Sequence, residues 1–149
     1  MLQCHLSQIC PLCNVIIYIL KKLGGVRTKR ILICGGISFS DEELFNKTLD
    51  EMINKENTIL VSGHAKGADT FAELYAEKHG IDIKIFPPEW SKYGRAAGPI
   101  RNKQMLDYIS KADENLVIAF WNGQSKGTKH TVETANKMGI KVQIIYYSV

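Results

Sequence analysis

Three glycine-containing segments hold the residues of this chain whose types and spacing could do chemistry. Gly35-Gly36, SGHAKG (62–67) and GQSKGT (123–128) each follow an apolar run. Glycine lets an anion approach the backbone closely, and a helix N-terminus offers unpaired N–H groups and about half a positive charge. Hydroxyl groups and cations in or near the segments add further donors, namely Ser62, Lys66, Arg101, Ser125, Lys126 and Thr128. The pattern predicts a site for a phosphate-bearing ligand; the alternative is that the glycines only form tight turns.

The elements that must position these segments alternate regularly from residue 30 onward. Apolar, largely β-branched runs predict strands over residues 30–34, 58–62, 81–86, 116–121 and 141–147. Helical spacing and end signals predict helices over residues 41–55, 67–80, 99–110 and 125–139. We therefore expect an α/β, Rossmann-like three-layer sandwich, whose five-stranded, mostly parallel sheet has helices on both faces. Ligands of such sheets bind beyond the carboxyl ends of the strands, where these glycines lie.

The first 29 residues differ in composition from the rest of the chain. Residues 1–30 contain five basic and no acidic residues, whereas residues 31–149 contain 14 basic and 15 acidic residues and are nearly neutral. Three of the four cysteines also lie there. We predict an N-terminal extension at residues 1–29, helical or disordered, and one globular domain at residues 30–149. A further alternative is that translation begins at Val26, so that residues 1–25 would not belong to the protein.

The N-terminal extension contains an apolar run and a cysteine cluster that need separate interpretations. The run at residues 15–20 is shorter than the roughly 17 to 25 residues of a membrane span, and the pattern of a secretory signal is missing. We therefore expect a cytoplasmic protein with no membrane partner. Cys10 and Cys13 have the spacing of zinc ligands, with Cys4 and His5 nearby, but a second well-spaced pair is missing. We expect no metal and no cofactor, with zinc as the alternative.

Four segments together resemble a known family. GGISF, VSGHAKGADTFAELYA, PPEWSKYGRAAGPIRNKQM and SKGTKHTVETA are similar, in order and spacing, to the SLOG superfamily and its small YspA- and YpsA-related proteins of bacteria and phages. The resemblance covers roughly residues 30–147. It implies a Rossmann-like domain that binds nucleotides or nucleotide-derived molecules such as ADP-ribose derivatives. Relatives include phosphoribohydrolases, DNA-processing proteins and sensors in bacterial defence systems, so the family alone does not fix the activity.

Two departures from the family pattern bear on catalysis. Ile37 stands where this branch usually has an arginine, which puts one phosphate contact in doubt. The resemblance also implies an arginine, matched by Arg101, and a catalytic glutamate three residues after a Gly-Thr pair, where this chain has Thr131. Glu133 lies two residues further, rotated by about 200° around the helix. Arg101 and Glu133 are thus the catalytic candidates, but threonine occupies the position at which the family has its catalytic glutamate.

Several side chains allow two interpretations. Asp69 could bond a ribose hydroxyl or cap its helix, and His64 could touch a phosphate or simply be exposed. Trp90, with Tyr93 and Arg95, could fold over a base, or Trp90 could anchor its loop in the core. Glu73, in contrast, has the pattern of an ordinary solvated helix face.

These observations predict a binding protein for a small nucleotide-derived ligand, acting as a sensor or a sequestering module. Hydrolysis of such a ligand at its N-glycosidic or phosphate bond is the alternative. A DNA-binding role is the third, disfavoured because the body is nearly neutral. A homodimer or higher homo-oligomer is expected. The predicted ligand-binding residues are Gly35, Gly36, Ser38, Phe39, Ser62, Gly63, His64, Ala65, Lys66, Gly67, Asp69, Arg95, Arg101, Asn102, Ser125, Gly127 and Thr128.

Overall fold

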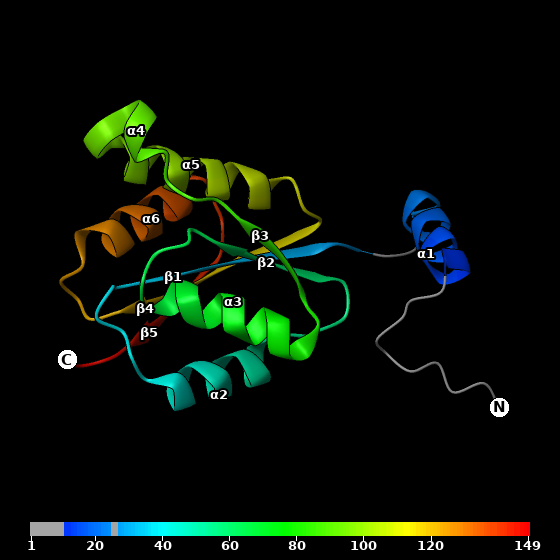
Figure 1. Ribbon diagram of the computed structural model, residues 1–149, viewed down its shortest axis with the longest axis horizontal. Coiled ribbons are helices and arrows are strands. Elements are labelled where there is room, and N and C mark those ends of the chain that lie inside the picture. Colours follow the sequence, from blue (N-terminus) through cyan, green and yellow to red (C-terminus); the bar gives the residue numbers. More distant parts are fainter. Residues whose placement is uncertain (1–10, 25–26) are drawn as a thin grey trace.

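The computed structural model describes residues 11–24 and 27–149, which form a layered α/β structure. Five strands make up the sheet: β1 (Lys29–Gly35), β2 (Thr58–Ser62), β3 (Asp82–Ile85), β4 (Glu114–Trp121) and β5 (Val142–Tyr146). Their order is β3-β2-β1-β4-β5, and each neighbouring pair is parallel (Figure 1). The predicted Rossmann-like fold class is confirmed, with pairing that is parallel throughout. The chain runs outward from β1 to β3 and then crosses back to β4, so the switch point lies at β1 and β4.

Two helices cover each face of the sheet (Figure 1). α2 (Glu42–Met52) and α3 (Ala68–His79) lie on one face, and α5 (Ala97–Ser110) and α6 (Lys126–Lys137) lie on the other. The short α4 (Trp90–Tyr93) and the 3-10 turn η1 (Gly94–Ala96) lead into α5. A connection between two parallel strands must cross over the sheet, which explains why at least one helix lies between each two consecutive strands along the chain.

The residues of β1 show how the sheet joins two apolar clusters. Ile31 and Ile33 point into the cluster under α2 and α3, while Leu32 and Cys34 point into the cluster under α5 and α6. Burial on both faces is the reason that the strand reads as a continuous apolar run. In the first cluster Phe45 stacks on Phe120, with ring centroids 5.0 Å apart.

Local signals set the ends of the helices. The side chain of Asp41 accepts a hydrogen bond from the backbone N–H of Leu44 at 2.9 Å and so caps α2. Gly80, in the left-handed conformation with φ 65°, ends α3. α5 begins at Ala97, slightly earlier than the predicted start at residue 99.

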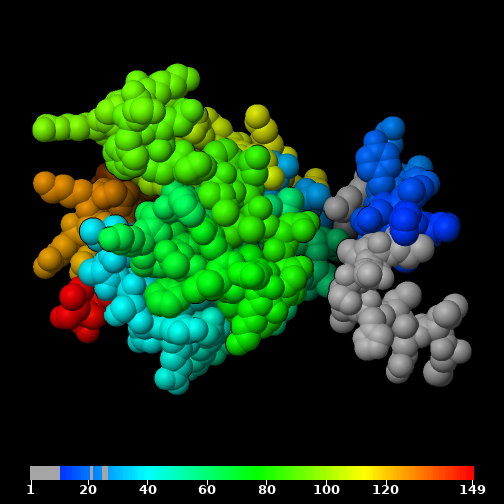
Figure 2. Space-filling view, in the orientation of Figure 1, coloured from blue at the N-terminus to red at the C-terminus, as the bar shows by residue number. Residues whose placement is uncertain are grey.

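α1 (Pro11–Lys22) lies beside the amino end of the sheet, outside the layers (Figures 1 and 2). Its Asn14, Ile17 and Leu20 share a shallow pocket with Asn57 and Ile81. Within the described ranges, no helix is long and apolar enough to cross a membrane. Cys13 is exposed on α1, whereas the other members of the zinc hypothesis, Cys4, His5 and Cys10, lie outside the described residues, as does Val26.

Candidate functional site

The loops that follow β1, β2 and β4 meet at the carboxyl end of the sheet and line one cavity of about 280 Å³. Its walls come from the end of β1, the β2–α3 loop, the first turns of α5 and the N-terminus of α6. The lining residues are Cys34, Gly35, Ile37, Ala65, Asp69, Arg101, Asn102, Met105, Ser125, Gly127, Thr128 and Thr131. A larger hollow of about 780 Å³ lies along α2, but that single helix lines it, with no glycine loop and several carboxylates. The smaller cavity therefore has the convergent polar groups expected of a ligand site.

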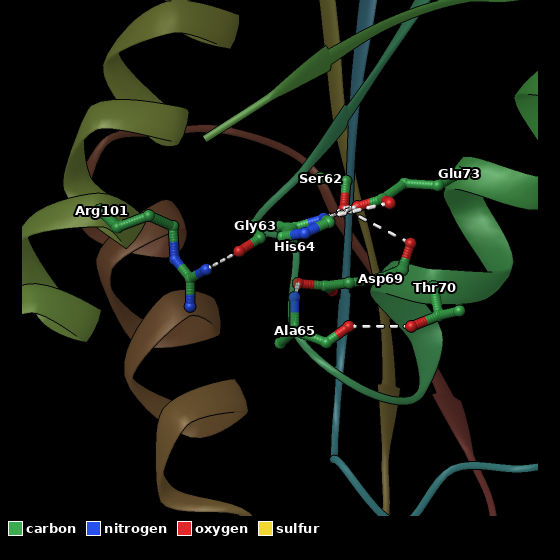
Figure 3. A network of polar contacts seen from close by, with 8 residues as sticks. All are labelled: Ser62, Gly63, His64, Ala65, Asp69, Thr70, Glu73 and Arg101. Carbon is green, nitrogen blue, oxygen red and sulfur yellow. Dashed lines mark hydrogen bonds and ion pairs between the residues drawn. The ribbon is translucent and has the colours of Figure 1, made fainter. Parts of the chain in front are cut away.

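Arg101 forms the cationic wall of the cavity and is fixed on one side (Figure 3). Its Nη1 donates to the carbonyl oxygen of Gly63, and its Nε donates to Oδ1 of Asn102 at 2.8 Å. Burial lowers the pKa of Arg101, and the charge of Asp69 opposes this, yet a guanidinium stays charged in a protein. Nη2 has no hydrogen-bond partner among the described residues, so it can serve a ligand. Asp107, an acidic residue on the same helix, pairs with Lys103 and not with Arg101.

Asp69 places a buried carboxyl group in the same cavity. It is 5% exposed, and its Oδ2 accepts a hydrogen bond from the backbone N–H of Ala65 at 3.2 Å. The N-cap of α3 is Gly67, without a side-chain hydrogen bond, so Asp69 closes the loop and does not cap the helix. Burial raises the pKa of Asp69 to about 6, although hydrogen bonding from Ala65 and the charge of Arg101 lower it. This carboxyl group therefore exchanges its proton near neutral pH.

Glu73 is part of a network and not of a solvated face, so its prediction as an ordinary exposed residue is wrong. Its Oε1 accepts from the hydroxyl of Ser62 at 3.0 Å and lies 3.0 Å from Nδ1 of His64. Figure 3 shows Glu73 and Arg101 on opposite sides of the loop. His64 is exposed and has a positive φ of 58°, which is unusual for a residue other than glycine. The network holds the loop that brings Ala65 and Asp69 to the cavity.

Most glycines of the first two loops lie against other parts of the protein that leave no room for a Cβ atom. Gly67 has a φ of 86°, and a Cβ atom there would overlap the carbonyl oxygen of Gly36. A Cβ atom on Gly35 would lie 2.7 Å from that of Ala68. Gly127 is different, because no atom lies within 4 Å of the position of its missing Cβ atom. Gly127 lines the cavity, so its backbone is accessible there without a side chain in front of it.

The helix N-termini at this edge differ in charge. Both Glu42 and Glu43 lie in the first turn of α2, which disfavours an anion there. The first turn of α6 contains no acidic residue, and Ser125 caps it by accepting from the N–H of Thr128 at 3.4 Å. The N-terminus of α6, beside Arg101, is therefore where the cavity favours negative charge.

The remaining predicted residues lie outside the cavity lining. Phe39 is in the core, with its ring centroid 4.7 Å from that of Phe120, and Ser38 shares a hydrogen bond of 3.1 Å with the hydroxyl of Tyr147. Glu133 is exposed on α6 within 3.8 Å of Lys129. The others off the lining are Gly36, Ser62, Gly63, His64, Lys66, Gly67 and Arg95.

The structure corrects the interpretation of Trp90 and adds four residues to the predicted site. Trp90 is 59% exposed, so its interpretation as a core anchor is wrong. Four residues line the cavity but were not among the predicted binding residues, namely Cys34, Ile37, Met105 and Thr131. Met105 lies one turn after Arg101 on α5, a spacing that could have identified it. Burial raises the pKa of the Cys34 thiol far above its ordinary value. Cys34 therefore lines the cavity as an uncharged side chain and is not a candidate nucleophile.

The fold and the cavity define a class, namely Rossmann-like α/β domains with a cationic cavity at the carboxyl edge of the sheet. A solved structure of DNA processing protein A (DprA) from Streptococcus pneumoniae has a similar fold, with a TM-score of 0.65 and 20% sequence identity. The similarity covers 82% of this chain and 52% of that one, so the chain spans about half the length of this relative.

Comparison of the sequence with protein families shows which of these Rossmann-like domains it resembles. Residues 29–93 match the model of the YspA, cpYpsA-related SLOG family, which confirms the predicted resemblance to the SLOG superfamily. The Gene 61 protein of Mycobacterium phage D29 is 29% identical over 121 residues, covering 76% of this chain and 94% of the phage protein. The matched region 29–93 contains the β2–α3 loop and Asp69 but ends before Arg101 and α6.

Proposed function

We propose that this protein binds a phosphorylated ribose derivative, either a nucleoside phosphate or an ADP-ribose-like molecule, as a sensor or a sequestering module. The observation that carries the proposal is the meeting of Arg101, the open backbone at Gly127 and the buried Asp69 in one cavity. The family match supports a nucleotide-related ligand in general terms.

The phosphate is assigned to the wall formed by Arg101 and α6. Ser125, Gly127 and Thr128 at the N-terminus of α6 line the same cavity as Arg101, and the first turn of a helix has N–H groups without partners within the helix. Gly127 adds no side chain that would hold the phosphate away from the backbone. Charge-assisted bonds from a guanidinium and from a helix N-terminus are the strongest phosphate contacts available to a protein without a metal.

A ribose hydroxyl is assigned to Asp69. A buried carboxylate gains most from a partner that donates a hydrogen bond, and a ribose hydroxyl is such a donor. Asp69 and Arg101 line the same cavity, so one ligand can reach both with its sugar and its phosphate. An inorganic phosphate would satisfy Arg101 alone, which favours a sugar phosphate as the ligand.

Binding without turnover is favoured by Thr131. Its hydroxyl donates to the carbonyl oxygen of Gly127 at 3.2 Å, and it supplies no carboxylate to a bond being cleaved. Glu133 is exposed next to Lys129 and does not line the cavity. The alternative is hydrolysis with Asp69 as the proton donor, which is supported by its pKa of about 6. Release of free adenine from AMP by the wild type, lost in Asp69→Asn, would establish the alternative.

The decisive experiment is calorimetric titration with AMP, ADP-ribose and ribose 5-phosphate. Arg101→Met should weaken binding by about 1.5 to 3 kcal/mol, because it removes a charge-assisted bond to the phosphate. Lys103→Met, an exposed cation on the same helix, is the matched control and should bind like the wild type. Gly127→Val should fold normally, since its side chain meets open space, but should lose binding. If Arg101→Met and Gly127→Val bind like the wild type, the cavity is not the site.

A DNA-binding role has less support. The DNA-processing function in the name of the structural neighbour belongs to that protein, and 20% identity extends only the fold to this chain. The nearly neutral body does not offer the clustered cations that non-specific DNA binding requires. A short single-stranded oligonucleotide in the same titrations provides the direct comparison.

A further inference from the structure

Trp90 is an exposed aromatic side chain that the cavity leaves unused. It is 59% exposed on α4, whereas the other tryptophan, Trp121, is half-buried and donates its indole N–H to the carbonyl oxygen of Ser125 at 3.0 Å. Tryptophan is a highly buried residue type on average, so an indole that is exposed by more than half offers a large apolar face to solvent. None of the residues of α4 is buried, so this face is accessible.

The position of Trp90 relates it to the cavity. A Cβ atom on Gly98 would lie 3.8 Å from Cη2 of Trp90, so the edge of the indole rests on the first turn of α5. Arg101 follows Gly98 by three residues, about 4.5 Å along the same face of the helix. α4 stands over the start of α5 in Figure 1. The indole therefore lies one helical turn from the cationic wall of the cavity.

The cavity is too small to hold the base of a nucleotide together with its sugar and phosphate. At about 280 Å³ it is at the lower limit of ligand pockets, which span about 300 to 1,000 Å³. A ribose phosphate held between Asp69 and Arg101 fills most of that space. The base must then leave the cavity, and the side next to Arg101 leads to the indole of Trp90.

The charges around Trp90 suit a nucleotide. Lys92 and Arg95 are exposed on the same short segment, and Nζ of Lys92 lies 4.9 Å from the ring centroid of Tyr93. Glu89 is the acidic residue of this segment, so the local balance is cationic. Cations beside aromatic rings are the usual environment for a stacked base that carries phosphates.

We infer that the nucleobase of the bound ligand stacks on Trp90, so that α4 is a base-binding platform next to the sugar-phosphate cavity. The inference rests on the proposed function and adds the chemical class of the second ligand moiety, a planar heteroaromatic ring. Stacking of a base on an aromatic side chain corresponds to about a 5- to 150-fold gain in affinity. A base-free ribose phosphate would not have this gain.

Calorimetry with two probes tests the platform. AMP should bind the wild type more tightly than ribose 5-phosphate by about 5- to 150-fold, and Trp90→Ala should remove that difference while leaving ribose 5-phosphate unchanged. Tyr146→Ala is the matched control, since Tyr146 is also an exposed aromatic residue but lies on the edge strand β5. Equal affinities of the wild type for the two probes, or a loss confined to Tyr146→Ala, would overturn the platform and leave the cavity intact. If neither probe binds, the proposed function fails and the platform with it.

Fluorescence gives an independent readout, because the chain contains two tryptophans. In Trp121→Phe, AMP should quench the emission of Trp90, whereas ribose 5-phosphate should bind without quenching. In Trp90→Phe, AMP should leave the remaining emission largely unchanged. Quenching that persists in Trp90→Phe and is lost in Trp121→Phe would assign the base to the other side of the cavity and overturn the inference.

Discussion

The substitution Asp69→Asn should change how the stability of the protein depends on pH. The pKa of Asp69 is raised from 3.8 to about 6 in the folded protein, mainly by burial. Between these values the folded state holds a proton that the unfolded state has lost, so the contribution of Asp69 to stability is complete below about pH 4 and is lost as the pH rises through about 6. A difference of about two pKa units corresponds to roughly 3 kcal/mol. Asparagine keeps an oxygen that can accept from the N–H of Ala65 but does not titrate.

The measurement is urea unfolding of both proteins without ligand at several values between about pH 4 and pH 7. The free energy of unfolding of Asp69→Asn minus that of the wild type should rise by roughly 3 kcal/mol across this range. Asp50→Asn is an informative control, because a hydrogen bond from the hydroxyl of Tyr75 lowers the pKa of Asp50. Its difference should stay nearly constant between about pH 4 and pH 7, because the contribution of Asp50 is lost only as the pH falls below its ordinary pKa.

A flat difference for Asp69→Asn would refute the argument that burial dominates the environment of this carboxyl group. The same result would remove the support that its pKa gives to Asp69 as a proton donor. A difference that falls as the pH rises would show that Arg101 stabilises the carboxylate more than burial destabilises it.

Three further predictions follow from the loops and the N-terminal segment. Gly67→Ala should lower the free energy of unfolding by at least about 1 kcal/mol, because its φ is positive and a Cβ atom would overlap Gly36, whereas Gly127→Ala should be neutral or stabilising by urea titration. Glu73→Ala should cost about 1 to 3 kcal/mol, because it removes a hydrogen-bond partner of the buried Ser62 hydroxyl, while Glu77→Ala on the same helix should cost little. Removal of residues 1–26, which keeps Thr28 with its hydrogen bond to Asp113 and Lys29 of β1, should lower the thermal midpoint by less than about 4 °C, and a larger drop would show that α1 stabilises the domain.

The fold could be predicted because its determinants are local and periodic. β1 reads as a continuous apolar run since Ile31 and Leu32 point to opposite buried faces, and Gly80 marks the end of α3 by its left-handed conformation. These features act through burial and backbone geometry, which sequence patterns report directly. The parallel order of the strands then brings the glycine loops to one edge without further information.

The details of the site depend on contacts that spacing does not encode. Glu73 has the helical position of a solvated residue, but the end of β2 brings Ser62 within 3.0 Å of it. Trp90 follows two prolines, a pattern that favours an anchored loop, and the Gly98 surface instead receives only the edge of its ring. In the same way, glycines that were predicted to make room for a ligand instead make room for other parts of the protein. A Cβ atom at Gly67 would overlap Gly36, and one at Gly63 would overlap Arg101.

The contact between Gly67 and Gly36 has a consequence for how such a domain can change its ligand during evolution. A Cβ atom at Gly67 would overlap the carbonyl oxygen of Gly36, so a side chain there requires the loop before α2 to move. A Cβ atom at Gly63 would overlap the guanidinium group of Arg101, which ties the loop before α3 to α5 in the same way. The short α4, in contrast, contains no buried residue. Adaptation to a different base should therefore proceed mainly by substitutions in α4, while the glycine loops and Arg101 are inherited together as one unit.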